Sequence, residues 1–455
     1  MKYLNKILLI ALLTAGVSAC DFLDPNEIED PNNPQLELVL ENASKPQLQN
    51  LVTGLEDRHR ATTGANNLLS TFGREVYPLF ASDPRFINQW VGVGANADAE
   101  NDPAFFGSAG AYSTPYRAVY QGNILIESVN NTDAVTDEER NGYLGFAKTL
   151  QAYSYLIPLM TQYKADPGNN HEGGIRIDVD DVENLGPFLE YDQALQEIRD
   201  LLDEALVNLN AAGPSFSFEL TAGFSEFNTP STFSDLNRAI AARAAIYAED
   251  WDGAITAVND AAPFFELAVG ADVMNKGGYF VYGDPPDIFN PFYYEPNTTA
   301  IQLPMVHPDL IADAEPGDLR VENKFFLRDD PISLQGLTSQ YQDNRFSGTG
   351  DSFPFFRNEE LILIYAEALA RRAQVTDLVD AVDAINMVRN TWNLGDFASA
   401  DQQAIIDQIL FERRYSLWFE GGHRWIDARR YDRLDDLPLD GGKIFEYLAR
   451  PQSEL

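Results

Sequence analysis

Acidic, basic and imidazole side chains are concentrated in one stretch near the C-terminus, "ERRYSLWFEGGHRWIDARRYD" (residues 412–432). Its proton-transferring groups are of the types that act as general acids and bases in enzymes: Glu412, Glu420, His423 and Asp427. The same residues suit ion pairs between packed helices, since Arg413 and Glu420 are seven residues apart and Arg424 and Asp427 are three apart. We interpret the stretch as structural and expect these two pairs to form.

Patterns of the common catalytic centres do not occur. One cysteine excludes a cysteine-based zinc site, and the four histidines lie far apart. There is no Gly-x-Ser-x-Gly and no His-Glu-x-x-His. A glycoside hydrolase needs two carboxylates about 5 to 9.5 Å apart, but 70 acidic residues supply such pairs by chance. We predict no enzyme, with a secreted glycoside hydrolase as the alternative from another class.

One acidic segment has the ligand types of a calcium site. This segment, "DVDDVEN" (residues 178–184), lacks the glycine of an EF-hand loop. We therefore predict no cofactor and keep calcium as the open alternative.

Sugar binding is the chemistry that the aromatic residues suggest. A pyranose ring has apolar faces that stack on aromatic rings, and its hydroxyls need polar partners. Trp90 lies in a polar, irregular segment beside Arg85, Asn88 and Gln89, so we predict a ligand platform there. We expect the other tryptophans in the core: Trp251, Trp392, Trp418 and Trp425.

A second aromatic cluster lies in "YFVYGDPPDIFNPFYYEP" (residues 279–296). Some of these rings could pack only within their own loop. The rings that we select as ligand-binding candidates are Tyr282, Phe292, Tyr293 and Tyr294.

Helical periodicity accounts for most of the remaining chain. Helices are predicted over 36–54, 112–130, 138–163, 191–210, 234–249, 251–262, 356–373 and 376–390. The last four form two helix pairs that are similar to tetratricopeptide (TPR) repeats. The predicted fold is therefore mostly α, a TPR-like scaffold with loop-rich insertions at about 80–111 and 263–354.

Charge narrows the class of partner. With 32 basic and 70 acidic side chains, the net charge is −38. Such a surface repels phosphate backbones, so no nucleic acid partner is expected.

The N-terminus predicts secretion and a lipid anchor. Residues 1–19 have two lysines followed by a short apolar run, which is typical of a signal peptide. "VSAC" ends at Cys20, the chain's one cysteine, and resembles a bacterial lipobox. We predict lipidation of Cys20, an acidic tether over 20–34 and one folded domain over 35–455.

Three stretches together resemble the SusD/RagB family of outer-membrane lipoproteins. The C-terminal stretch over 412–432 is similar to the family's Glu-Arg-Arg, Glu-Gly, Arg-Trp pattern. "LILIYAEALARRA" with "DAINMVRN" resembles two family helices, and "AKTLQAYSYLIPLMTQY" (residues 147–163) is a weaker match. Ser416 stands where the family often has Glu.

The resemblance implies a helical scaffold with a loop-rich ligand face. It also implies a lipid-anchored location at the outer membrane, exposed at the cell surface, and a SusC-like TonB-dependent barrel as partner. The expected function is capture of oligosaccharides for uptake through that barrel. A peptide-binding RagB-like component and a lid without a ligand of its own are the alternatives.

Overall fold

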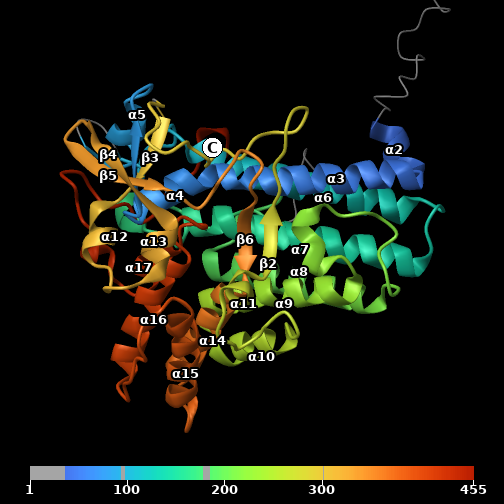
Figure 1. The fold of residues 1–455 in the computed structure, drawn as a ribbon. Helices are drawn as coiled ribbons and strands as arrows, with labels where there is room; N and C mark the ends of the chain where they lie inside the picture. Colours follow the sequence, from blue (N-terminus) through green and yellow to red (C-terminus); the bar gives the residue numbers. More distant parts are fainter. Residues whose placement is uncertain (1–35, 94–97, 178–184, 301, 455) are drawn as a thin grey trace, which may run out of the picture.

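Long helices that lie side by side make up most of the fold (Figure 1). The computed structural model describes residues 36–93, 98–177, 185–300 and 302–454. The signal peptide, Cys20, the tether and the acidic segment 178–184 lie outside the described residues, so these remain predictions. Within the described ranges, no helix is both long and apolar enough to cross a membrane.

Each long helix contacts the next one along the chain, from α3 through α6, α7, α8 and α9. The long helices are α3 (Lys45–Ala61), α6 (Ser108–Asn131), α7 (Asp137–Gln162), α8 (Tyr191–Ala211), α9 (Pro230–Tyr247), α14 (Asn358–Arg372), α15 (Asp377–Thr391) and α16 (Gln402–Ser416). The shorter ones are α2 (Leu36–Asn42), α4 (Asn66–Phe72), α5 (Arg85–Asn88), α10 (Trp251–Asp260), α11 (Ala271–Asn275), α12 (Pro308–Ala312), α13 (Leu319–Lys324) and α17 (His423–Arg430). The mostly helical, repeat-like scaffold predicted from the sequence is confirmed.

Local sequence explains where the helices begin. Thr136 and Glu139 form a capping box at the start of α7. The single helix predicted over 36–54 is wrong, because α2 ends at Asn42 and α3 starts anew at Lys45. The backbone N–H of Ser44 donates to the Gln47 side chain, and Pro46 suits a first helical turn because it has no N–H to satisfy.

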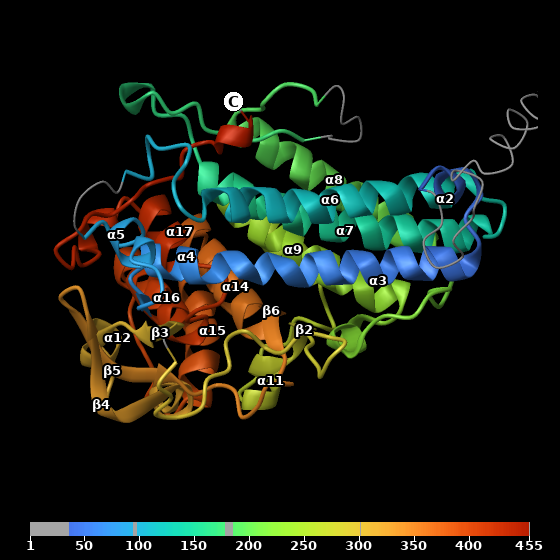
Figure 2. The same cartoon turned by 90° about the horizontal axis from the view of Figure 1, so that it is seen from above.

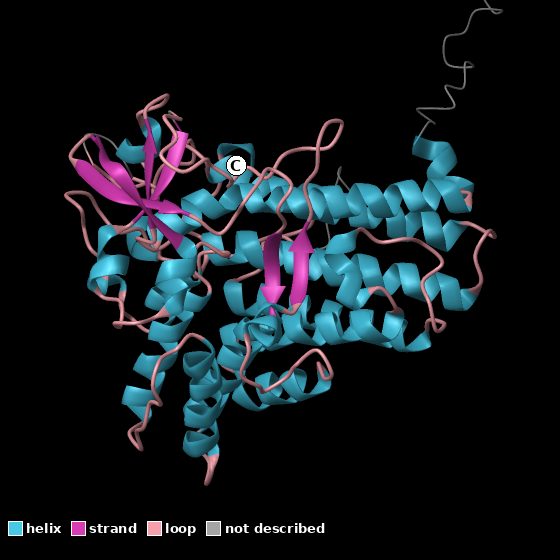
Figure 3. Ribbon diagram, in the orientation of Figure 1, coloured by secondary structure: helices cyan, strands magenta, loops and turns pink. Residues whose placement is uncertain are grey.

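The insertion predicted to be loop-rich over about 263–354 contains strands as well as loops, and a further strand ends where the predicted insertion at about 80–111 begins (Figure 3). Four antiparallel strands form a sheet in the order β1 (Val76–Phe80), β3 (Gln302–Val306), β5 (Leu337–Asp343) and β4 (Phe325–Leu334). A two-stranded sheet pairs β2 (Gly277–Phe280) with β6 (Phe353–Arg357). Sequence patterning missed these strands because they are short and contain prolines, with Pro78 opposite Pro304.

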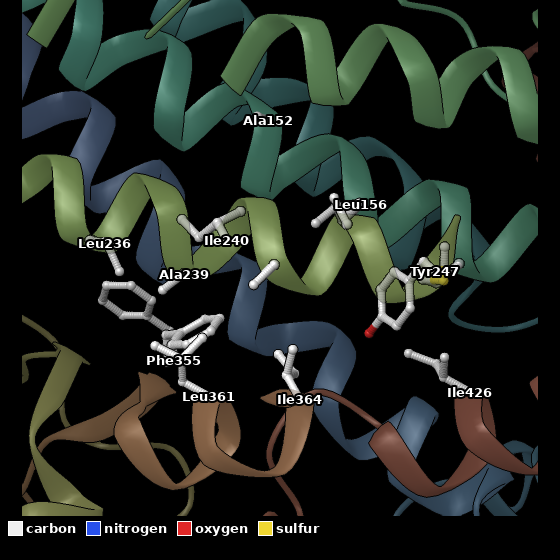
Figure 4. Close-up of a cluster of buried hydrophobic side chains, with 14 of the residues drawn as sticks. Ala152, Leu156, Leu236, Ala239, Ile240, Tyr247, Phe355, Leu361, Ile364 and Ile426 are labelled. Carbon is white, nitrogen blue, oxygen red and sulfur yellow. The ribbon is translucent and has the colours of Figure 1, made fainter. Parts of the chain in front are cut away.

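The main core lies where α7, α9, α14 and α17 meet β6 (Figure 4). Alanines along α9 are fully or almost fully buried, including Ala239, Ala242 and Ala245. Small side chains allow the neighbouring helices to approach α9 closely. Phe355 of β6 and Ile426 of α17 complete this cluster, so the C-terminal helices and the insertion share one core.

Four charged side chains form a closed ring of ion pairs beside this core. Arg413 of α16 contacts Glu367 of α14 at 2.6 Å and Asp427 of α17 at 2.9 Å. Arg430 contacts the same two carboxylates, at 2.6 and 3.0 Å. Burial raises the pKa of Glu367, but the two guanidiniums outweigh it and leave that pKa at about 2.

The pairs predicted within the C-terminal stretch are therefore wrong in detail. Glu420 contacts Arg357 of β6 at 3.0 Å rather than Arg413. Asp427 pairs with Arg413 and Arg430, and not with Arg424. The partners differ because the chain turns between α16 and α17, which places each side chain against another element.

Replacing Arg413 by Gln tests the ring. The change leaves two buried carboxylates with one guanidinium between them, so we expect the free energy of unfolding to fall by about 3–5 kcal/mol. Urea unfolding followed by circular dichroism measures it. Arg433→Gln, which removes a partly exposed pair with Asp407, is the control and should cost less than about 1 kcal/mol. Equal losses in the two variants would contradict a special role for the ring.

Candidate ligand-binding surface

Trp90 lies beneath the surface and does not face a ligand. The residue is 5% exposed, and its indole N–H donates to the Phe106 carbonyl at 2.7 Å. Phe86 contacts its ring edge-on, with 4.8 Å between the centroids. The expectation that Trp90 is a stacking platform is corrected, because a covered ring offers no face to a sugar.

The side chains predicted around Trp90 have different roles. Arg85 is the exposed member: 56% of its side chain is accessible, and its guanidinium lies 4.1 Å from the centre of the Phe106 ring. It also pairs with Asp83 at 2.6 Å. Gln89 accepts a hydrogen bond from the Phe106 backbone N–H, while Asn88 is half-buried. We call Arg85, Asn88 and Phe106 the α5 surface.

The second predicted cluster is also mostly internal. Tyr282 and Phe292 are buried, so the expectation that these rings stack on a ligand is corrected as well. Tyr293 is half-buried, and its hydroxyl donates to Glu295 at 2.6 Å. Tyr294 packs against the apolar cluster that contains Ile87 of α5. The segment 281–294 thus reaches the region of the α5 surface at its far end.

A groove of about 510 Å³ lies at the near end of that segment, beside α3. Seen from above, α3 runs between α6 on one side and β2 with β6 on the other (Figure 2). We call this the α3 groove. It is lined by Asn50, Thr53, Gly54, Glu56, Asp57, His59, Arg60, Thr221, Phe224, Tyr279, Phe280, Val281 and Asp287.

Glu56 supplies the most enclosed carboxylate of the groove. The residue is 7% exposed, and its Oε1 accepts hydrogen bonds from the Thr221 backbone N–H and hydroxyl at 2.9 and 2.8 Å. Burial raises the pKa of this carboxyl, and the Thr221 hydrogen bonds only partly offset the effect. Oε2 makes no hydrogen bond with the described residues and is open to a ligand donor.

Arg60 ties the groove wall to α3. Its guanidinium donates to Asp57, to the Val281 carbonyl and to Asp287, each at 2.8 Å. Burial lowers the pKa of Arg60, but its hydrogen bonds to Asp57 and Asp287 and their charges outweigh burial and raise that pKa. The groove therefore holds three carboxylates and one guanidinium.

Glycines bring Tyr279 into position. A Cβ on Gly223, in the 3-10 helix η4 (Ala222–Phe227), would lie 1.9 Å from the Tyr279 carbonyl oxygen. A Cβ on Gly278 would lie 2.3 Å from the Phe355 ring. Only glycine allows these close approaches, which seat β2 against the core. Tyr279, which is half-buried, thereby becomes part of the groove wall.

His59 lies at the back of the groove in an aromatic box. Its ring is 4.7 to 4.9 Å from Tyr153, Phe280 and Phe355, and both ring nitrogens lack a hydrogen bond. The residue is 1% exposed, and burial lowers its pKa to about 3. The imidazole is therefore neutral at physiological pH and serves as an aromatic wall.

Sequence reasoning missed the α3 groove because its parts come from distant segments. The polar residues of α3 at 50, 53, 57 and 60 have the spacing of a solvated helix face. Tyr279 belonged to the aromatic cluster noted in the sequence, but nothing placed it beside α3. The signal that could have found Glu56 is a carboxylate on the otherwise apolar side of that helix. No group of three or more metal-ligating side chains occurs within the described ranges.

Comparison with known proteins finds a family match in the C-terminal part of the chain. Residues 332–449 match the model of the SusD family. No curated protein sequence is similar enough to this chain to count as a match.

Solved structures share the fold over most of this chain. Surface glycan-binding protein A from Bacteroides uniformis aligns with a TM-score of 0.67 and 14% identity, over 90% of this chain and 97% of that one. The corresponding protein from Bacteroides thetaiotaomicron, solved in complex with laminarihexaose, gives 0.65 and 14%, with the same coverage. NanU from Bacteroides fragilis gives 0.64 and 14%, over 93% and 97%.

His59 predicts a loss of stability in acid. Between pH 6.5 and about 3 the unfolded chain binds a proton at this residue that the folded chain does not. The contribution of His59 to the free energy of unfolding is therefore fully present above pH 6.5. It falls as the pH is lowered, by about 2.7 kcal/mol at pH 4.5. His59→Phe should remove that contribution. The test is the difference in unfolding free energy between wild type and variant at several pH values, and a difference that does not change with pH would refute it.

Proposed function

We propose that this protein is a cell-surface glycan-binding lipoprotein that captures oligosaccharides and passes them to a SusC-like TonB-dependent transporter in the outer membrane. The observation that carries the binding role is the α3 groove, which is lined by Tyr279 and by Glu56, an enclosed carboxylate with one oxygen that accepts no hydrogen bond from the described residues. The match of residues 332–449 to the SusD family and the fold shared with glycan-binding proteins support the proposal.

The groove chemistry favours a neutral sugar. Hydroxyl groups would donate to Glu56 Oε2 and to the Asp57 and Asp287 carboxylates, while an apolar ring face would lie on Tyr279. Three carboxylates against one guanidinium repel sulfate and uronate groups. A longer oligosaccharide would follow the segment 281–294 toward Arg85 on the α5 surface.

A binding role without catalysis fits the same groove. Asp57 and Asp287 both accept hydrogen bonds from Arg60, so neither is placed as a free proton donor. Among relatives named here, two are called glycan-binding proteins. Release of reducing sugar by the purified protein would contradict this assignment.

Replacing Glu56 by Gln tests the groove with little change of shape. The amide oxygen can still accept from Thr221, but the free carboxylate oxygen becomes an N–H donor. We expect affinity for the oligosaccharide to fall about tenfold or more, because a hydrogen bond to a charged group contributes about 1.5–3 kcal/mol. Isothermal titration against neutral hexasaccharides, laminarihexaose among them, and against a sulfated one measures it.

Two controls make the result specific. Glu197→Gln changes an exposed carboxylate on α8 and should leave affinity unchanged. Arg85→Ala tests the α5 surface separately. If the Glu56 variant binds as tightly as wild type and the Arg85 variant does not, the site lies at the α5 surface. A binding signal in the titration with a peptide mixture, and none with any sugar, would favour the RagB-like alternative.

The anchor is tested at Cys20. The wild-type chain, expressed in a bacterium with lipoprotein processing, should incorporate radiolabelled palmitate and partition with the outer membrane. The Cys20→Ala variant should lose the label and appear in soluble fractions, because without acyl chains it binds the membrane much more weakly than the lipidated wild type does. An unlabelled wild-type chain would contradict lipidation.

A further inference from the structure

Asp235 of α9 is a buried carboxylate without a partner. The residue is 9% exposed and makes no hydrogen bond or ion pair with the described residues. Arg238, one turn further along α9, points elsewhere and donates to Asp203 and to the Leu202 carbonyl, at 2.8 and 2.9 Å. The charge of Lys276 acts on Asp235 without forming an ion pair with it, and the Lys276 ammonium donates to the Pro263 carbonyl at 3.0 Å.

This carboxylate borders a groove of about 460 Å³ formed by α8, the segment 212–214, the start of α9 and the end of α10. These helices adjoin one another in the lower part of the molecule (green in Figure 1). We call it the α9 groove. Its lining residues are Leu206, Leu209, Asn210, Ala212, Gly213, Pro214, Pro230, Ser231, Ser234, Asp235, Arg238 and Asp260.

The groove combines apolar walls with one uncompensated carboxylate. Leu206, Leu209 and the two prolines form the walls, and the Ser234 hydroxyl is already committed to the Pro230 carbonyl at 2.9 Å. Burial raises the pKa of Asp235 to about 7, and the charge of Lys276 offsets this only in part. A cation that entered the groove would supply the missing partner.

The apolar walls and the single buried carboxylate of the groove favour one kind of cation over another. A divalent metal needs several oxygen ligands, and no group of three metal-ligating side chains occurs in the described part of the chain. An ammonium group on an aliphatic stem suits the groove better, because the stem lies on apolar surface while the charged end meets a carboxylate.

We propose that the α9 groove binds a primary ammonium group carried on an aliphatic stem, with the ammonium at Asp235 and the stem between Leu209 and Pro230. The group is either a free alkyl diamine or the lysine side chain of a peptide or protein. This site is separate from the α3 groove and does not depend on the proposed function.

The test uses the folded protein and four small probes. Cadaverine represents a free diamine, and Nα-acetyl-lysine methylamide represents a lysine side chain within a chain. The matching norleucine derivative has the stem without the charge, and the arginine derivative replaces ammonium by guanidinium. Binding is followed by ligand-observed NMR at about 150 mM salt, where surface charges more than about 8 Å apart are screened.

We expect an ammonium probe to bind wild type and the norleucine derivative not to bind. Asp235→Asn should weaken the binding about tenfold or more, because the charge-assisted hydrogen bond is lost. Asp383→Asn on the exposed face of α15 is the matched control and should leave it unchanged. Asp260→Asn, at the exposed end of α10, should have a smaller effect than Asp235→Asn.

Each outcome decides the proposal. If only cadaverine binds, the site is supported and its ligand is a free diamine. If only the lysine derivative binds, the site is supported and its ligand is a lysine side chain. Equal binding of the norleucine derivative, tighter binding of the arginine derivative, unchanged binding in Asp235→Asn, or no binding of either ammonium probe overturns it. A thermal unfolding curve of Asp235→Asn, which removes an unpaired buried charge, verifies that this variant is folded.

Discussion

The ring formed by Arg413, Glu367, Arg430 and Asp427 is the constraint on which the rest of the structure depends. Its charges come from α14, α16 and α17, and each carboxylate accepts from both guanidiniums. Removing these groups from water is costly unless every charge is paired. A shift of any one helix would leave a charge uncompensated, so the three helices have one permitted arrangement. Ile426 of α17 then meets α7 and α9 in the shared core (Figure 4).

Further ion pairs connect the C-terminal helices to the wall of the α3 groove. Arg243 of α9 contacts Glu360 of α14 at 2.6 Å, and Arg357 of β6 contacts Glu420 at 3.0 Å. These pairs fix β6, and β6 pairs with β2, which carries Tyr279. The wall of the α3 groove is therefore held by the buried charges of the C-terminal segment. The segment 412–432, which we interpret as structural, therefore helps to set the shape of the α3 groove.

The molecule combines a rigid scaffold with surfaces of different chemistry. The α3 groove offers hydrogen-bond acceptors and an aromatic ring, which suits a neutral polyhydroxylated ligand. The α9 groove, formed by the scaffold helices, offers apolar walls and one carboxylate, which suits an ammonium group. Both grooves contain carboxylates, in keeping with a net charge of −38. What each groove can bind depends on the surroundings of Glu56 and of Asp235 rather than on the net charge.

The sequence by itself determined most of the helices and the buried positions of Trp392, Trp418 and Trp425, while Trp251, also expected in the core, is only partly buried. Most helices follow from local periodicity. The binding role of the segment 279–294 stays a prediction. It could not show that Trp90 is buried, because the residues next to it in sequence are polar whereas Phe86 and Phe106 contact its ring in the fold. It also could not pair Arg413 with Glu367, which lies 46 residues away. Those contacts, and the grooves at Glu56 and Asp235, exist only when distant segments pack together. Packing and charge pairing are non-local, so the tertiary structure alone decided them.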